Sequence, residues 1–214
     1  MENIDALTLE KHDCNTSHIS LIMEHKLAGE FFPILQQGFG EMVLVPCTVK
    51  NLLCDQFGLS DAYVSGRITT IFLDGKPTDS IDEVIVKERS TIALSAAMPG
   101  VVGATMRRGS FYASMRSAIT CQDKGKDGAS KEGMIWVKLF NLLLTDLGPE
   151  FLKKGIIMTP SALSDFFIQK TDTFWQGCNG ALINGKPVAP ASLKRAALYT
   201  DCEIIRLSIE FQYD

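Results

Sequence analysis

The chain repeats its own pattern of motifs in its two halves. A run that begins at Glu30, EFFPILQQGFGEMVLVPCTVKNLL, has a later counterpart from Leu147, LGPEFLKKGIIMTPSALSDFF. The turn motif IFLDGKP is answered by ALINGKP, and a β-rich run follows each of them, TIALSAA or EIIRLSIEF. Because self-similarity at a fixed offset decides the architecture before any single motif does, we predict an internal duplication.

The landmarks of this repeat keep the same order with only a small drift in offset. The matching positions are Gly38 with Gly155, Pro46 with Pro160, Gly75 with Gly185, and Leu94 with Leu207. Turns of the form X-Gly-Lys-Pro are common, so the alternative is chance similarity. An ordered set of such landmarks favours duplication over chance.

Each copy reads as strand, helix, strand, helix, strand, strand. Apolar runs and turn signals place the first copy's elements at 18–25, 31–38, 41–46, 49–57, 67–73 and 91–97, and the second copy's at 134–140, 148–155, 156–160, 161–169, 181–187 and 203–211. We expect Gly38 and Gly155 to end their helices with positive φ, as glycine does at a helix C-terminus. Thr48 and Ser161 are the expected N-caps of the second helix in each copy.

These elements predict an α+β protein with mixed sheets, built as a duplicated β-α-β-α-β-β unit. The predicted parts are an N-terminal segment (1–17), a first repeat (18–99), a Gly/Arg segment with a linker (100–132), and a second repeat (133–214). We expect the repeats to pack with pseudo-two-fold symmetry, as a covalent version of a homodimer does. The sequence leaves open whether the repeats share one core, and it leaves the oligomeric state open.

The stretch from Thr48 to Gly100 resembles the ubiquitin-like β-grasp sulfur carriers of molybdopterin and thiamine synthesis. A helix, TVKNLLCDQF, precedes a strand that ends in a turn, TTIFLDGKP, and a later strand leads to a glycine-containing tail, STIALSAAMPG. The resemblance implies a β-grasp-like topology. The carriers use a C-terminal Gly-Gly, whereas Pro99-Gly100 is internal here, so the carrier chemistry is not transferred.

Composition excludes several classes of partner. With 46% apolar and 21% charged residues, the 214-residue chain is an ordinary globular one. A net charge of −4 gives no electrostatic basis for binding nucleic acid. No apolar stretch reaches the roughly 18 residues of a membrane helix, so we expect no membrane association. The polar start, MENIDALTLEKHDC, lacks the pattern of a signal peptide, so we expect a cytoplasmic protein.

The metal-ligating residue types do not form a recognised site. His12, Asp13, Cys14 and His18 form a loose H-D-C-x-x-x-H cluster, and His25 follows; solvated or strand-edge residues are the simpler interpretation. The six cysteines contain no C-x-x-C pair and read as reduced thiols. We therefore predict neither a metal nor a cofactor.

No catalytic residue can be named from a motif. The chain has no nucleophile elbow and no H-E-x-x-H sequence. The acidic residues around the first hairpin, Asp74, Asp79, Asp82 and Glu83, are expected to form a solvated turn rather than a catalytic pair. Whether the protein is an enzyme is left open.

Residues 98–116, called the Gly/Arg segment below, have no counterpart in the second copy and are the candidate functional region. Their glycines allow close backbone approach, and arginines offer bidentate donors to phosphate or carboxylate. The candidate ligand-binding residues are Gly100, Gly103, Thr105, Arg107, Arg108, Gly109, Tyr112 and Arg116. The alternatives are a structural crossover, with arginines paired to acidic residues of the other half, and a contact for a protein partner.

Two functional hypotheses follow. The first is a non-enzymatic binding or accessory protein whose Gly/Arg segment contacts an anionic small molecule or a protein partner. The second is an enzyme acting on an anionic metabolite between the repeats, with Arg107 and Arg108 binding the substrate. An exposed apolar patch around Val101 and Val102 would favour the partner version of the first hypothesis.

Overall fold

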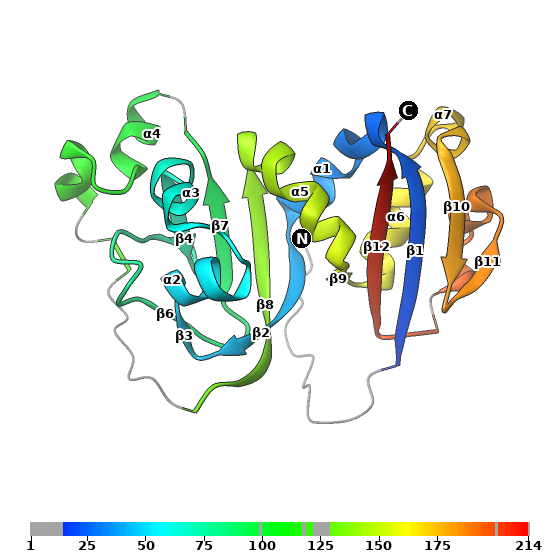
Figure 1. Cartoon of the computed structure of the whole chain (residues 1–214), viewed down its shortest axis with the longest axis horizontal. Coiled ribbons are helices and arrows are strands. Elements are labelled where there is room, and N and C mark those ends of the chain that lie inside the picture. The colour runs from blue at the N-terminus through cyan, green and yellow to red at the C-terminus, as the bar shows by residue number, and fades with distance from the viewer. Residues whose placement is uncertain (1–14, 99, 117–118, 122–128, 200, 214) are drawn as a thin grey trace. The chain divides into compact units, whose positions relative to one another are not determined.

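The protein is a mixed α+β structure in which strands and helices occur along the whole described chain (Figure 1). The computed structural model describes residues 15–98, 100–116, 119–121, 129–199 and 201–213. The chain divides into two compact units: a central unit of residues 28–151, and a terminal unit that joins residues 1–27 to residues 152–214. Each predicted repeat is therefore shared between the units, and its first strand lies in the unit formed mainly by the other repeat.

The strands of the central unit follow the order β2-β8-β7-β4-β5. Of these neighbours, β7 and β8 are parallel and the other pairs are antiparallel. The bounds are β2 Phe39–Val45, β4 Thr70–Leu73, β5 Lys76–Pro77, β7 Thr91–Ser95 and β8 Lys131–Phe140. A separate short pair joins β3 (Cys47–Thr48) to β6 (Ile85–Val86).

Helices and turns of the central unit connect these strands. They are α1 Phe32–Gln37, α2 Val49–Asn51, the π-helical turn η2 Leu52–Gln56, α3 Asp61–Gly66, α4 Gly100–Met106 and the 3-10 helix η3 Phe111–Arg116. Two further helices, η1 (His25–Phe31) and α5 (Leu142–Lys154), extend across the unit boundaries. Thr48 is the N-cap of α2, as predicted, because its hydroxyl accepts from the backbone N–H of Asn51.

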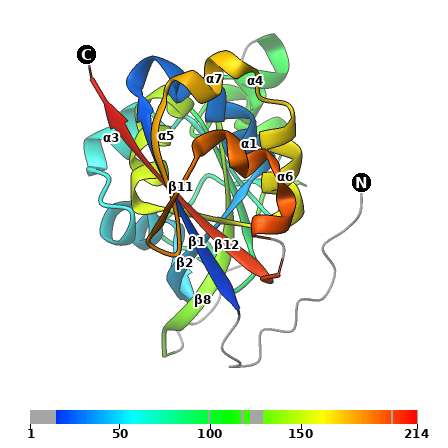
Figure 2. The same cartoon turned by 90° about the vertical axis from the view of Figure 1, so that its right-hand side faces the viewer.

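The strands of the terminal unit follow the order β11-β10-β1-β12-β9. Strands β1 and β12 are parallel and lie side by side (Figure 1, Figure 2); their neighbours pair antiparallel. The bounds are β1 Thr16–Glu24, β9 Ile156–Met158, β10 Cys178–Ile183, β11 Lys186–Val188 and β12 Ile204–Gln212. The helices are α6 Pro160–Ile168, α7 Asp172–Gln176, η4 Pro190–Lys194 and η5 Ala196–Leu198.

In each unit, the strand registers bring apolar residues of neighbouring strands opposite one another, so that they form one row across the sheet. Residues that face one another in the sheet pairings form these rows: Phe39, Val137, Ile92 and Leu73 in the central unit, and Ile156, Leu207, Ile19 and Ile183 in the terminal unit. All of them except Ile183 are buried. Burial of each such side chain contributes about 1.5–3 kcal/mol, so these rows are a main source of sheet stability.

Tight turns occupy the positions that the sequence indicates. Asp74-Gly75 has φ of 49° and 77°, and Asn184-Gly185 has the same two values. Positive φ at both central residues is the type I′ geometry that joins antiparallel strands with their natural twist. Gly38 and Gly155, with φ of 116° and 94°, confirm the positive φ expected at these positions.

Some helix boundaries differ from the predictions. The predicted helix 49–57 becomes the single turn α2 followed by η2, where the backbone N–H of Phe57 reaches Leu52 O. The cap of α6 is Thr159, not Ser161, because Pro160 takes the first helical position and the Thr159 hydroxyl accepts from the N–H of Ala162. Within the described residues, no helix combines the length and apolar character needed to cross a bilayer.

Candidate functional site

The Gly/Arg segment leaves the end of β7 and enters α4 through a tight backbone contact. Gly100 opens the helix with φ of 77°. Gly103 lies so close to the preceding backbone that a Cβ built on it would be 1.9 Å from the carbonyl oxygen of Met98. Both glycines therefore have structural reasons to be glycine, and the contact fixes the direction in which α4 leaves the sheet.

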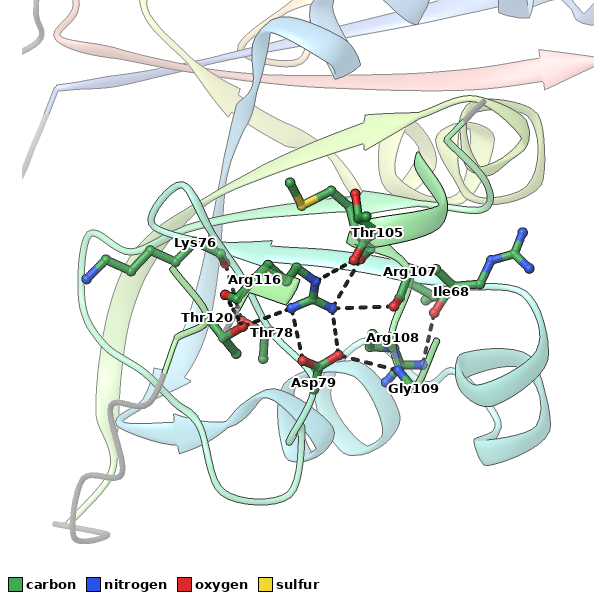
Figure 3. Close-up of polar contacts among 11 residues, drawn as sticks. Ile68, Lys76, Thr78, Asp79, Thr105, Arg107, Arg108, Gly109, Arg116 and Thr120 are labelled. Carbon is green, nitrogen blue, oxygen red and sulfur yellow. Dashed lines mark hydrogen bonds and ion pairs between the residues drawn. The ribbon is translucent and has the colours of Figure 1, made fainter. Parts of the chain in front are cut away.

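Arg116, at the end of η3, is buried and binds Asp79 through two hydrogen bonds (Figure 3). Its Nη1 lies 2.9 Å from Asp79 Oδ2 and its Nη2 lies 2.8 Å from Asp79 Oδ1. The Nε group donates to the carbonyl oxygen of Thr105, 2.6 Å away in α4. The bidentate ion pair ties η3 to the loop after β5, and the Nε hydrogen bond ties η3 to α4.

Gly109 adds a backbone donor to the same carboxylate. Its φ is 61°, and its N–H donates to Asp79 Oδ1 at 3.4 Å. We call Asp79, Gly109 and Arg116 the Asp79 clasp. The glycine-plus-arginine cradle predicted for an anion therefore surrounds an internal carboxylate. The structural alternative placed that acid in the other half of the chain, whereas Asp79 belongs to the same unit.

Arg108 is directed at the C-terminal end of α3. Its Nη2 donates to the carbonyl oxygens of Val64 and Ile68, at 2.7 and 2.9 Å. A cation suits this position, because the last carbonyls of a helix lack partners within it. Desolvation by burial lowers the pKa of Arg108, and the nearby carboxylate of Asp79 acts in the opposite direction. Its buried Nε has no hydrogen-bond partner within the described residues.

Of the other candidate residues, Thr105 has a hydrogen-bond partner within its own helix, whereas Arg107 and Tyr112 are exposed. The Thr105 hydroxyl donates to Val102 O at 2.7 Å, within α4. Arg107 is exposed, and Figure 3 shows its side chain extending away from the Asp79 clasp. Tyr112 is also exposed, and its ring meets the ring of Phe111 edge-on at 5.4 Å. Of the predicted cations, Arg107 is exposed, Arg108 is partly buried and Arg116 is buried.

Apolar side chains dominate the outer surface of this segment. The exposed fractions are 82% for Val101, 63% for Val102, 89% for Phe111 and 47% for Tyr112. Sequence analysis singled out the two valines but not Phe111. The sequence did indicate that apolar side chains here could be exposed, since neither α4 nor η3 has the apolar spacing of a helix with one buried face.

A second polar cluster lies elsewhere in the central unit and was not predicted. Asp146 in α5 accepts from Arg67 Nε at 2.6 Å and from the Tyr63 hydroxyl at 3.1 Å. Burial, followed by the hydrogen bond to Asp146, raises the pKa of Tyr63 to about 12. The hydrogen bond from Arg67 lowers the pKa of Asp146. The cluster joins α3 to α5. No sequence motif predicts this contact, because its residues lie far apart in the chain.

The histidine and cysteine predictions are only partly covered by the structure. His12, Asp13 and Cys14 lie outside the described residues. The ring of His25 stacks on Tyr213 with centroids 4.2 Å apart. Within the described part of the chain, no group of three or more His, Cys, Asp or Glu side chains could hold a metal ion, and no two cysteines form a disulfide.

The acidic residues of the first hairpin have separate structural partners. Asp74 accepts from the N–H of Thr91 at 2.7 Å, and Asp82 forms an ion pair with Lys50 at 3.0 Å. Asp79 belongs to the Asp79 clasp. These three carboxylates are therefore involved in structural contacts.

Comparison with family models, curated proteins and solved structures found no match to this chain. The functional proposal is therefore built on the residues and contacts of the Gly/Arg segment.

Proposed function

We propose that the protein is a non-enzymatic binding or accessory protein whose Gly/Arg segment docks a protein partner. One observation carries this proposal: the segment turns two of its arginines inward and its apolar side chains outward. Arg108 and Arg116 bind carbonyl oxygens and Asp79, whereas Val101 and Phe111 are among the most exposed apolar side chains of the described residues. Exposed apolar side chains gathered on one segment are typical of interaction sites.

The chemistry of the segment describes the partner that it fits. Phe111 and Tyr112 offer large rings that a pocket can bury, and aromatic anchors of this kind carry much of the energy of protein interfaces. Arg107 lies in the same segment with its side chain in solvent. We therefore expect a partner with an apolar pocket and an acidic group at its rim, since charges at the rim favour encounter and orientation.

An anionic small molecule is a weaker fit. To bind it, Arg116 would have to give up a bidentate pair and Arg108 would have to leave the carbonyl oxygens of Val64 and Ile68. Of the three arginines of the segment, Arg107 is the exposed one, and interactions between exposed charges contribute little. The same contacts weaken the enzymatic alternative, which used Arg107 and Arg108 together to bind a substrate.

The finer architecture is also a proposal: the two repeats, 18–99 and 133–214, are copies of one β-grasp-like α+β motif. Its support is the repeated order of elements, in which β1, α1, β2, α2, β4, β5 and β7 are followed by β8, α5, β9, α6, β10, β11 and β12. The equal φ values of the two hairpin turns and the matching apolar rows add to it. In this view α4 and η3, inserted between β7 and β8, are the specialised part of the central unit.

Site-specific photo-crosslinking tests the docking proposal. A photoreactive phenylalanine is placed at Phe111, and the matched control carries it at Ile168, which is 63% exposed on α6 of the terminal unit. We expect a defined adduct from Phe111 alone. The captured protein is then purified, and its affinity is measured against Phe111→Ser and Ile168→Ser.

The expected result is a loss of about tenfold or more in affinity for Phe111→Ser, and no change for Ile168→Ser. Equal crosslinking at both positions, or an unchanged affinity for Phe111→Ser, would contradict the proposal. A thermal shift by inorganic phosphate that disappears in Arg107→Ala would favour the anion alternative instead.

A further inference from the structure

The hairpin turn of each unit holds a neighbouring strand with the same set of hydrogen bonds. In the central unit, Asp74 Oδ1 accepts from the N–H of Thr91 at 2.7 Å, and the N–H of Asp74 donates to Thr91 O at 2.9 Å. In the terminal unit, Asn184 Oδ1 accepts from the N–H of His18 at 2.8 Å, and the N–H of Asn184 donates to His18 O at 2.8 Å. Thr91 of β7 and His18 of β1 are thus equivalent.

The serine that precedes each of these residues makes the corresponding contact. The Ser90 hydroxyl donates to Asp74 Oδ2 at 3.1 Å. The Ser17 hydroxyl donates to Asn184 Oδ1 at 3.4 Å. A carboxylate and an amide oxygen can both accept from a hydroxyl, so the aspartate and the asparagine play one role.

The two strands also share a sequence pattern in this register. Residues 17–21 read Ser-His-Ile-Ser-Leu, and residues 90–94 read Ser-Thr-Ile-Ala-Leu. Ile19 and Ile92 are fully buried, each opposite the hairpin residue that precedes the turn. Strand β1 therefore matches β7 in hydrogen bonding, register and sequence at once.

Chain order would pair these strands differently. As the first strand of its repeat, β1 corresponds to β8, and the final strand β12 corresponds to β7. The sheet pairings instead set β1 in the place of β7, and β12 in the place of β8. Because β7 and β8 are parallel, as are β1 and β12, this interchange leaves the direction of every strand pairing unchanged.

We propose that β1 is a donor strand, held in a slot of the terminal unit between β10 and β12 that recognises an extended segment of pattern Ser-x-Ile-x-Leu. The donor comes from the beginning of the chain, and residues 28–151 separate it from the rest of its unit. Recognition has two components. Asn184 forms hydrogen bonds with the backbone of His18 through its own backbone and its side chain. The side chains of Ile19 and Leu21 are buried in the core. This inference is independent of the Gly/Arg segment.

Two grafts into the full-length chain test the correspondence. The double variant His18→Thr with Ser20→Ala makes residues 17–21 identical to residues 90–94. The competing graft gives residues 17–21 the sequence of Ile135–Leu139 in β8, as chain order would have it. We expect the first graft to melt within about 4 °C of the wild type and the second to lose cooperative unfolding of the terminal unit. Unfolding of the first graft, or equal tolerance of both, would overturn the proposal.

Paired amide hydrogen exchange provides a measurement that does not depend on tolerance to a graft. Asn184→Ala is expected to accelerate exchange of the His18 amide, and Asp74→Ala that of the Thr91 amide, each by about fivefold or more. Asn184→Asp, which copies the central unit, should keep the His18 amide protected. A response in one unit without the other, or an unprotected His18 amide in Asn184→Asp, would show that the slots are not equivalent.

Discussion

Asp79 organises the Gly/Arg segment from outside it. Its carboxylate accepts from the Arg116 guanidinium and from the Gly109 N–H, so it receives donors from the end of η3 and from the turn between α4 and η3. The sequence indicates that glycines and arginines in this pattern can hold an anion. It does not indicate that the anion is Asp79, because that contact joins residues 37 positions apart and has no local signature.

Removing this carboxylate is predicted to destabilise the protein. Asp79→Ala leaves the guanidinium of Arg116 buried without a counter-charge, which we expect to cost about 2 kcal/mol in the free energy of unfolding, measured by urea denaturation. The control is Arg107→Ala, which removes an exposed cation of the same segment and should change the value by no more than about 0.5 kcal/mol. Equal effects of the two substitutions would mean that the Asp79 clasp is not a stabilising contact.

The hydroxyl of Tyr63 is predicted to titrate late. Burial and the hydrogen bond to Asp146 raise its pKa to about 12, above the ordinary value near 10. A raised pKa means that the neutral phenol is stabilised in the folded state. Its contribution is therefore complete below about pH 10 and is lost as the pH rises through about 12. Ultraviolet titration of tyrosinate should show this late step in the native protein and not in Tyr63→Phe; an unchanged curve would contradict the assignment.

At the scale of elements, local chemistry was readable from the sequence where one or two residues decide the geometry. Thr48 caps its helix and Gly38 ends its helix because the physical requirement is local. The π-helical turn η2 was not predicted, since an i+5 hydrogen bond leaves the apolar pattern of 49–57 nearly unchanged. The outward face of α4 was predicted only in part. Val101 and Val102 were considered as an exposed patch, but hydrophobic periodicity cannot orient a helix that buries so few of its side chains.

Gly103 is predicted to be the residue that allows α4 to form where it does. In Gly103→Ala the new Cβ would meet the Met98 carbonyl, so the segment from residue 98 must move. We expect faster proteolysis and amide exchange across α4 and η3, with the strands of the central unit still protected. Gly66→Ala is the control, since nothing lies within 4 Å of a Cβ there and alanine favours a helix by about 1 kcal/mol. Matching behaviour of the two variants would remove this role from Gly103.

At the scale of the whole molecule, the sequence predicted a mixed α+β protein but not the division of the chain into two units. The landmarks set Leu94 against Leu207, because both end the apolar core of a final strand. By sheet register, Leu94 corresponds to Leu21, since they lie opposite Ile71 and Ala181 in equivalent hairpins. Two parallel neighbouring strands with the same apolar pattern look alike in the sequence. The hydrophobic periodicity therefore cannot tell which of them takes which place in the sheet, and only the long-range strand pairings can.

In the terminal unit, β1 and β12 are predicted to unfold together, although they come from opposite ends of the chain. Leu207 of β12 is buried opposite Ile19 of β1, so Leu207→Ala should cost about 2–5 kcal/mol and accelerate amide exchange in both strands. Val137→Ala, at the matching position of the central unit, should instead accelerate exchange in β2 and β7. Exchange measured by mass spectrometry on both variants separates the units. If each substitution accelerated exchange uniformly through all the strands, the two units would be one cooperative structure. If each acts within its own unit, stability follows the contacts in space, and β1 belongs energetically with the end of the chain.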